Sequence, residues 1–229
     1  MISVTLDRPW LEARLTRPMR LLSWAPYGAG LVVADRVLWR EVRNADLTPD
    51  FDAEHWFAGE MAGRASGAVG LLTSRDIGGW RVVAAEAGGV RAAALATVGL
   101  SNAEAVGARL PWHPADYGTI NLLVVVQAGL TEAAQLEAMS IAVQARTAAV
   151  MAAGLDLATG LATGTGTDCA VLACDAGLGR YAGLHTDVGE AVGAAARGAV
   201  AAGVGDWLDW RQAERLRRAE AGQRPDRAT

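Results

Sequence analysis

The sequence predicts a single α+β domain, in which a mostly antiparallel or mixed sheet is covered by two long helices rich in alanine and glycine. Short apolar runs separated by glycine, proline and polar turns are typical of strands and fill the first half of the chain. Two longer stretches, at residues 131–153 and 187–203, carry Ala, Gly and Val stripes that permit close helix packing. A chain of 229 residues, 52% of them hydrophobic, can bury one large core. We therefore expect one domain over residues 1–210 and a polar, arginine-rich, partly disordered tail at 211–229.

The start of the chain is expected to be extended. The sequence APYGAG, at residues 25–30, interrupts the apolar pattern and separates one extended segment from a second at 31–42. A short helix is predicted over 52–64, because Phe57 and Met61 lie four residues apart on one helical face.

An antiparallel meander is expected after this helix. Turns that contain glycine part three short apolar runs, at residues 68–74, 79–87 and 91–101. Ser101 and Glu104 then have the spacing of a capping box, which predicts a brief helix.

The second half is predicted to follow the order β-α-β-β-α. Its first helix should begin after an N-cap at Thr131 and end at Gly154, and the second should start at Thr186 or Asp187. A turn at Ala128 and Gly129 should end the first strand before that helix. The strands are expected at residues 119–127, 156–163 and 168–174.

Charge and composition exclude several classes of function. The net charge is −4 and the pI is about 5.4, so the chain has no basic field to attract nucleic acid or an anionic membrane surface. The sequence contains no lysine, which excludes a Schiff-base lysine and a phosphate-binding P-loop.

A cytoplasmic location is expected. The charged N-terminal stretch does not resemble a signal peptide, and the small-apolar region 188–205 contains Glu190 and Arg197, so we expect no membrane span. Cys169 and Cys174 lie five residues apart on an extended strand and therefore on opposite faces, where they cannot form a disulfide. Unpaired cysteines fit a reducing compartment.

A threonine-rich turn with the sequence LATGTGTDCAVLAC occupies residues 161–174. It fails the dinucleotide fingerprint, because Cys169 stands where a third glycine would follow Gly164 and Gly166, and the next segment resembles a strand. Two interpretations remain open. The Thr and Asp side chains either satisfy backbone groups of a turn, or they offer hydroxyl and amide groups to a substrate.

His185 is a candidate general base or else a surface histidine. Asp187 and Glu190, which follow it, have the spacing of a capping box, whereas His185 has no evident structural role. His55 and His113 lack partners at ligand spacing, so no metal site is expected.

Tryptophan is abundant for a chain of this length. Core packing explains most of these side chains, although some could form a platform for a flat ligand. The eight are Trp10, Trp24, Trp39, Trp56, Trp80, Trp112, Trp207 and Trp210.

Seven sequence motifs resemble those of the adenosylcobinamide amidohydrolases of corrinoid salvage, over roughly residues 21–203. The resemblance implies hydrolysis of the amide that joins a propionate of the corrin ring to aminopropanol, giving adenosylcobyric acid. One departure is Gln144-Ala145-Arg146, where members of the family often carry an acid and a lysine. The motifs are LLSWAPYGAG, VGLLTS, VGLSNA, GTINLLVVV, QARTAAV, ATGTGTD and RYAGLHTDVGE.

The resemblance favours a catalytic or substrate-binding loop and suggests site residues. We expect Asp168 and His185 to act as one unit, in which His185 activates water or a threonine hydroxyl. Candidate catalytic residues are His185, Asp168, Glu190 and Asn121. Candidate substrate-binding residues are Thr163, Gly164, Thr165, Gly166, Thr167, Asn102 and Thr73.

No cofactor is expected, because the corrinoid itself is the substrate. The expected partner is therefore this small molecule, with no nucleic acid and no membrane, and a homo-oligomer is compatible with the sequence. Two alternatives stay open. The chain could bind corrinoids without catalysis, or it could be an amidohydrolase or acyltransferase acting on another substrate.

Overall fold

The computed structural model describes residues 1–43, 51–111 and 118–222, which form one large mixed sheet and three α-helices. The strand order of the sheet is β4-β3-β2-β12-β8-β6-β5, and β1 pairs with β2. Among the strand pairs in the described residues, only β3–β4 and β8–β12 are parallel. The strands of the sheet are β1 (Ile2–Asp7), β2 (Trp10–Ser23), β3 (Gly30–Glu41), β4 (Val69–Thr73), β5 (Arg81–Ala87), β6 (Val90–Val98), β8 (Ile120–Leu130) and β12 (Cys169–Ala176).

The helices are α1 (Ala53–Ala65), α2 (Glu132–Ala152) and α3 (Asp187–Gly222), with a short 3-10 helix η2 (Ile77–Gly79). Two small ribbons complete the described elements: β7 (Ala103–Glu104) with β11 (Gly164–Thr165), and β9 (Asp156–Leu157) with β10 (Gly160–Leu161). The predicted α+β class, with two long helices over a mostly antiparallel sheet, is confirmed.

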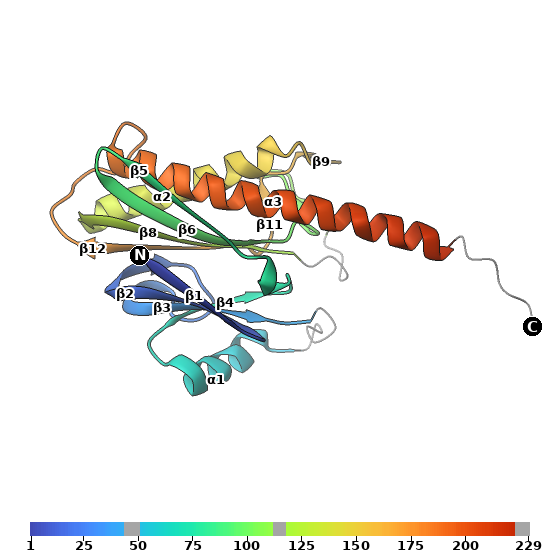
Figure 1. The fold of residues 1–229 in the computed structure, drawn as a ribbon, viewed down its shortest axis with the longest axis horizontal. Coiled ribbons are helices and arrows are strands. Elements are labelled where there is room, and N and C mark those ends of the chain that lie inside the picture. The colour runs from blue at the N-terminus through green and yellow to red at the C-terminus, as the bar shows by residue number, and fades with distance from the viewer. Residues whose placement is uncertain (44–50, 112–117, 223–229) are drawn as a thin grey trace, which may run out of the picture.

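The sheet bends back on itself, so that the molecule has four layers (Figure 1). α2 and α3 cover β5, β6, β8 and β12, while β1 to β4 lie beneath these strands and α1 covers the outer side. The long strand β2 pairs with both halves and has a register shift between Arg14 and Met19. Side chains of both halves, among them Leu21, Trp39 and Leu123, fill the space inside the bend.

Small residues let α3 lie directly on the sheet. A Cβ at Gly198 would come within 2.9 Å of the Val83 side chain, and one at Gly203 within 2.6 Å of Val98. The close packing that the glycine stripe predicted is therefore present, and a larger residue at either position would clash with the sheet.

Local signals placed the helix starts correctly. The Asp52 side chain accepts a hydrogen bond from the His55 N–H, and Thr131 accepts one from Ala134 at 3.3 Å. α3 starts at Asp187 as expected, but the cap is Thr186, whose hydroxyl accepts the Gly189 N–H at 3.0 Å. The expected capping box of Asp187 and Glu190 is therefore wrong. α3 also continues through Gly222, well beyond residue 203.

The expected meander is wrong at β4. β4 pairs in parallel with β3 at one end of the strand order, while β5 and β6 form a hairpin at the other. The reason is α1, because a helical crossover between β3 and β4 allows a parallel pair that a short turn does not.

Three further local expectations differ from the structure. Ser101 and Glu104 do not cap a helix, since Ala103–Glu104 is strand β7. Residues 156–163 contain only the short strands β9 and β10. The turn expected at Ala128 and Gly129 is absent, because β8 runs to Leu130 beside an irregular register in β12.

Close backbone contact makes Gly177→Ala a test of the packing after β12. A Cβ at Gly177 would lie 2.5 Å from the Gly129 Cα, a backbone atom that cannot move aside alone. We expect the free energy of unfolding, measured by urea denaturation, to fall by about 1–3 kcal/mol.

The exposed helical Gly205 is the matched control, because a Cβ there would meet nothing within 4 Å. Gly205→Ala should raise stability by about 0.8–1 kcal/mol through helix propensity. Equal stability of Gly177→Ala and wild type would contradict the packing described here.

Candidate active site

The segments that precede β8 and β12 meet at one end of the sheet. The two strands are parallel, with Cys169 opposite Asn121, so the residues before each strand share an edge. The threonine-rich turn lies there and is joined to the 103–106 segment through the β7–β11 ribbon. The Thr163 N–H donates to the Glu104 carbonyl at 2.8 Å, and the Thr163 hydroxyl accepts the Val106 N–H at 2.8 Å.

The Asp168 carboxylate organises this turn. Its Oδ1 accepts the Ile120 N–H at 2.9 Å and the Thr165 hydroxyl at 2.5 Å, and its Oδ2 accepts the Thr165 N–H at 3.0 Å. Nη1 of Arg146, on α2, lies 3.2 Å from Oδ2. A carboxylate with four such partners has its acceptor sites filled. Asp168 therefore ties the turn to β8 and α2 and is not a free base.

The Arg146–Asp168 ion pair is largely buried, with side chains 13% and 6% exposed. Within the described residues, Nη2 of Arg146 makes only a long contact of 3.5 Å, to the Thr147 hydroxyl, and the buried Nε has no hydrogen-bond partner. The guanidinium therefore keeps donors that a ligand can use.

Further hydrogen bonds join the threonine-rich turn to neighbouring segments. The Thr167 hydroxyl donates to the Gly118 carbonyl at 2.9 Å, and the Thr119 hydroxyl donates to the Thr167 carbonyl at 2.8 Å. The Trp24 indole N–H donates to the Asp168 carbonyl at 2.7 Å. The Thr167 side chain thus satisfies a backbone carbonyl, as the simpler interpretation of the turn predicts.

A cavity of about 410 Å³, here called the loop cavity, opens between the turn and α2. One oxygen of the Glu104 carboxylate accepts the Leu110 N–H at 3.0 Å, and the other has no partner in the described residues. A Cβ at Gly164 would lie 2.6 Å from Asp168 Oδ2, so only glycine fits there. The cavity is lined by Glu104, Ala105, Val106, Val143, Arg146, Thr147, Thr163, Gly164, Thr165, Gly166 and Asp168.

Asn121, Asn102 and Thr73 lie near this end of the sheet but outside the loop cavity. Asn121 is buried on the face of β8 that points into the bend, and its Nδ2 donates to the Leu72 carbonyl at 2.8 Å. The buried Thr73 hydroxyl accepts the Arg75 N–H at 3.0 Å. Asn102 lines an adjoining hollow of about 170 Å³.

His185 lies at the opposite end of the sheet. It is exposed, makes no side-chain hydrogen bond to the described residues, and lines a cavity of about 540 Å³ beside residues 137–144 of α2, here called the helix-end cavity. Glu137, in its wall, accepts the Ala182 N–H at 2.6 Å. Glu190 is exposed on the first turn of α3.

The expected contact between Asp168 and His185 is therefore wrong. Asp168 precedes β12 and His185 follows it, and eight extended residues span about 26 Å. Along α2, Arg146 beside Asp168 and Glu137 beside His185 are nine residues apart, which is about 13 Å of helix rise. The ATGTGTD and RYAGLHTDVGE motifs both resemble those of one family, but strand β12 lies between them and keeps them apart.

The two cysteines lie on opposite faces of β12, as predicted, and both are free thiols. Burial, with a smaller contribution from the Asp168 charge, raises the pKa of Cys169 to about 11, so this thiol is protonated at neutral pH. The described residues contain no cluster of three or more His, Cys, Asp or Glu side chains able to hold a metal ion. His113 lies outside them. No helix in the described ranges is long and apolar enough to cross a membrane.

A family model for adenosylcobinamide amidohydrolases matches residues 2–212. The chain belongs to this family. No curated protein and no solved structure matches it. The match covers nearly all of the described residues. It includes the residues that line the loop cavity and those that line the helix-end cavity.

Glu104 and Arg146 are residues of this site that sequence reasoning missed. The spacing of Glu104 from Ser101 suggested a helix cap, which gave the carboxylate a structural role. The available signal was its position directly after the VGLSNA motif at residues 98–103. Only the β7–β11 pairing shows that Glu104 lies beside the threonine-rich turn.

Proposed function

We propose that this chain hydrolyses the amide between the corrin-ring propionate and aminopropanol of adenosylcobinamide, giving adenosylcobyric acid and free aminopropanol. The observation that carries the proposal is the family match over residues 2–212, which includes every residue that lines the loop cavity.

The size of the loop cavity supports an amide side chain as the reacting group. At about 410 Å³ it suits a small ligand, whereas a corrin macrocycle with its side chains is far larger. The macrocycle would therefore lie outside the mouth, with only the propionamide linkage inserted. A substrate held in this way presents one amide to the residues of the cavity wall.

Glu104 is the proposed general base. Among the carboxylates that line the loop cavity, Asp168 is fully hydrogen-bonded, while Glu104 keeps one oxygen without a partner in the described chain. That oxygen would take a proton from a water molecule as the water attacks the amide carbon. The proton would then pass to the departing amine nitrogen as the C–N bond breaks.

Arg146 and the backbone N–H of Gly166 are the proposed donors to the oxyanion. Both line the same cavity as Glu104. One general base accelerates a reaction roughly 10²–10⁴-fold. This is well short of the about 8–23 kcal/mol by which enzymes lower the activation free energy. Each well-placed oxyanion donor adds about 2.7–4 kcal/mol. Asp168 acts as a positioning residue that holds Arg146 and the turn.

His185 provides the test between the two cavities. Because it faces the helix-end cavity, we expect His185→Ala to reduce kcat by far less than the roughly 10²–10⁴-fold cost of removing a general base. Steady-state turnover of adenosylcobinamide by the folded variant checks this. A loss within that range would transfer the base role to His185 and the chemistry to the helix-end cavity.

The function itself is tested by incubating the full chain with adenosylcobinamide and identifying the products by mass spectrometry. Hydrolysis in ¹⁸O-water should place one labelled oxygen in the carboxylate product, and turnover should survive treatment with a chelator. Binding without cleavage would instead identify a corrinoid-binding protein. Release of aminopropanol from other amides but not from adenosylcobinamide would indicate a different substrate.

A further inference from the structure

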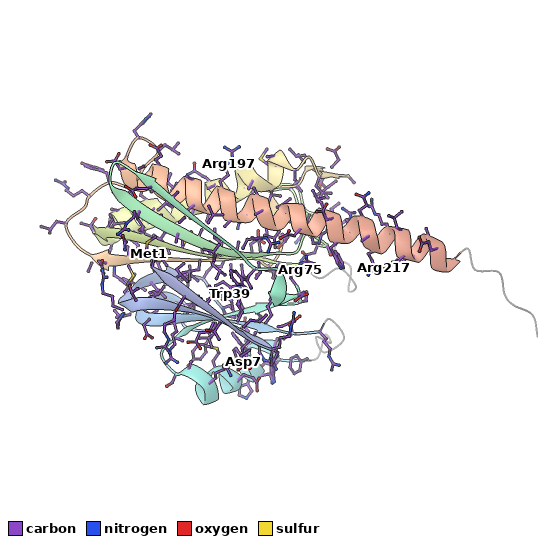
Figure 2. The ribbon with its side chains drawn as sticks, in the orientation of Figure 1. Met1, Asp7, Trp39, Arg75, Arg197 and Arg217 are labelled. Carbon is purple, nitrogen blue, oxygen red and sulfur yellow. The ribbon has the colours of Figure 1, made fainter. Side chains whose placement is uncertain are left out.

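A separate hollow lies between α3 and the loop that follows β4. Its volume is about 320 Å³, and its walls include Arg75, Trp210, Glu41, Asp76 and Ser101. Arg75 lies beneath α3, on the side of the helix that faces the sheet (Figure 2). None of these five residues lines the loop cavity.

Arg75 and Trp210 form a cation–π pair in which part of the aromatic ring stays exposed. The Arg75 guanidinium carbon is 5.2 Å from the centroid of the Trp210 ring, which is 42% exposed. Burial lowers the pKa of Arg75, yet its side chain donates no hydrogen bond and forms no ion pair within the described residues. A half-buried guanidinium has five donors to satisfy, so it calls for acceptors from a ligand.

Acceptor groups face the same hollow. Glu41 and Asp76 each use one carboxylate oxygen for Arg8, at 2.6 and 2.5 Å. The other oxygen of each side chain has no partner in the part of the chain that the structure describes. The hollow therefore combines an aromatic face, a guanidinium and free carboxylate oxygens, a set that complements a flat heterocycle carrying both an amino group and ring nitrogens.

We propose that this hollow binds the adenine of the adenosyl group of the corrinoid substrate. The purine would stack on the exposed part of the Trp210 ring beside Arg75, its amino group would donate to Glu41 or Asp76, and its ring nitrogens would accept from Arg75. The inference rests on the proposed function, since it assigns a second part of that substrate to a second place on the same molecule.

The hollows on this side of the molecule adjoin one another, as a large substrate requires. Ser101 lines both the hollow beside Trp210, where adenine is proposed to bind, and the neighbouring hollow of about 170 Å³. The wall of this second hollow also contains Glu104. Glu104 in turn lines the loop cavity. In the proposed binding mode, one corrinoid presents its propionamide to the proposed base and its adenine to Trp210.

Trp210→Ala tests the assignment by comparing two substrates, adenosylcobinamide and dicyanocobinamide, which lacks the adenosyl group. Loss of base stacking should lower kcat/KM for adenosylcobinamide by about 5- to 150-fold and leave kcat/KM for dicyanocobinamide unchanged. Trp210→Phe should recover much of the loss. Trp56→Ala is the matched control, because Arg40 lies 5.2 Å over that ring in the opposite layer; it should leave the ratio of the two kcat/KM values unchanged.

Equilibrium dialysis of 5′-deoxyadenosine against the full chain keeps this inference separable from the proposed function. Wild type should bind the nucleoside and Trp210→Ala should bind it at least about 5-fold more weakly, even if neither corrinoid is hydrolysed. If the ratio of kcat/KM for adenosylcobinamide to kcat/KM for dicyanocobinamide is the same in wild type and Trp210→Ala, the proposal is overturned. If the nucleoside still binds at Trp210 in that case, the hollow serves a free nucleoside and not the substrate.

Discussion

Glu104→Gln is expected to lower kcat on adenosylcobinamide by roughly 10²–10⁴-fold, the usual cost of losing a general base. The substitution removes the proton-accepting oxygen, but a glutamine amide oxygen can still accept the Leu110 N–H that the carboxylate accepts at 3.0 Å. We therefore expect the thermal unfolding midpoint to stay close to that of wild type. KM should change little, because the variant keeps the shape of the loop cavity.

Glu137→Gln is the matched control for this experiment. Glu137 also accepts one backbone N–H, from Ala182, and also lines a cavity, but at the other end of α2. Its substitution should leave kcat near the wild-type value. A large loss in Glu137→Gln with normal turnover in Glu104→Gln would place the chemistry in the helix-end cavity.

Asp168→Ala is expected to lower the free energy of unfolding by about 3–5 kcal/mol, the cost of leaving one member of a buried ion pair without its partner. The change strands the Arg146 guanidinium and removes the acceptor of the Ile120 and Thr165 N–H groups. Urea denaturation measures the loss. Turnover should fall as well, because the donor from Arg146 and the turn would both lose their support.

Two further variants separate charge from simple loss of packing. Asp168→Ala combined with Arg146→Met removes the stranded charge and should be more stable than Asp168→Ala alone. Asp206→Ala breaks the Arg81–Asp206 pair, whose side chains are 43% and 30% exposed, and should cost only about 0–1 kcal/mol. Equal losses in Asp168→Ala and Asp206→Ala would contradict the role assigned to the buried pair.

The sequence by itself determined the features that depend on neighbouring residues. The caps at Asp52 and Thr131 follow from side chains that reach their own helix N–H groups. Gly154 ends α2 with φ +65°, a conformation that glycine adopts without strain. The opposite faces of Cys169 and Cys174 follow from the two-residue period of a strand. Family motifs likewise identified the threonine-rich turn, whose residues line the loop cavity.

Only the tertiary structure decided which segments meet. Strand pairing depends on long-range partners, so β4 joined β3 across a helix although its sequence resembled the next strand of a meander. The same holds for the site. β12 separates Asp168 from His185 by its length, while pairing of β7 with β11 brings Glu104 to the turn. Local chemistry sets the conformation of each segment, but the contacts that make a cavity come from residues far apart in the chain.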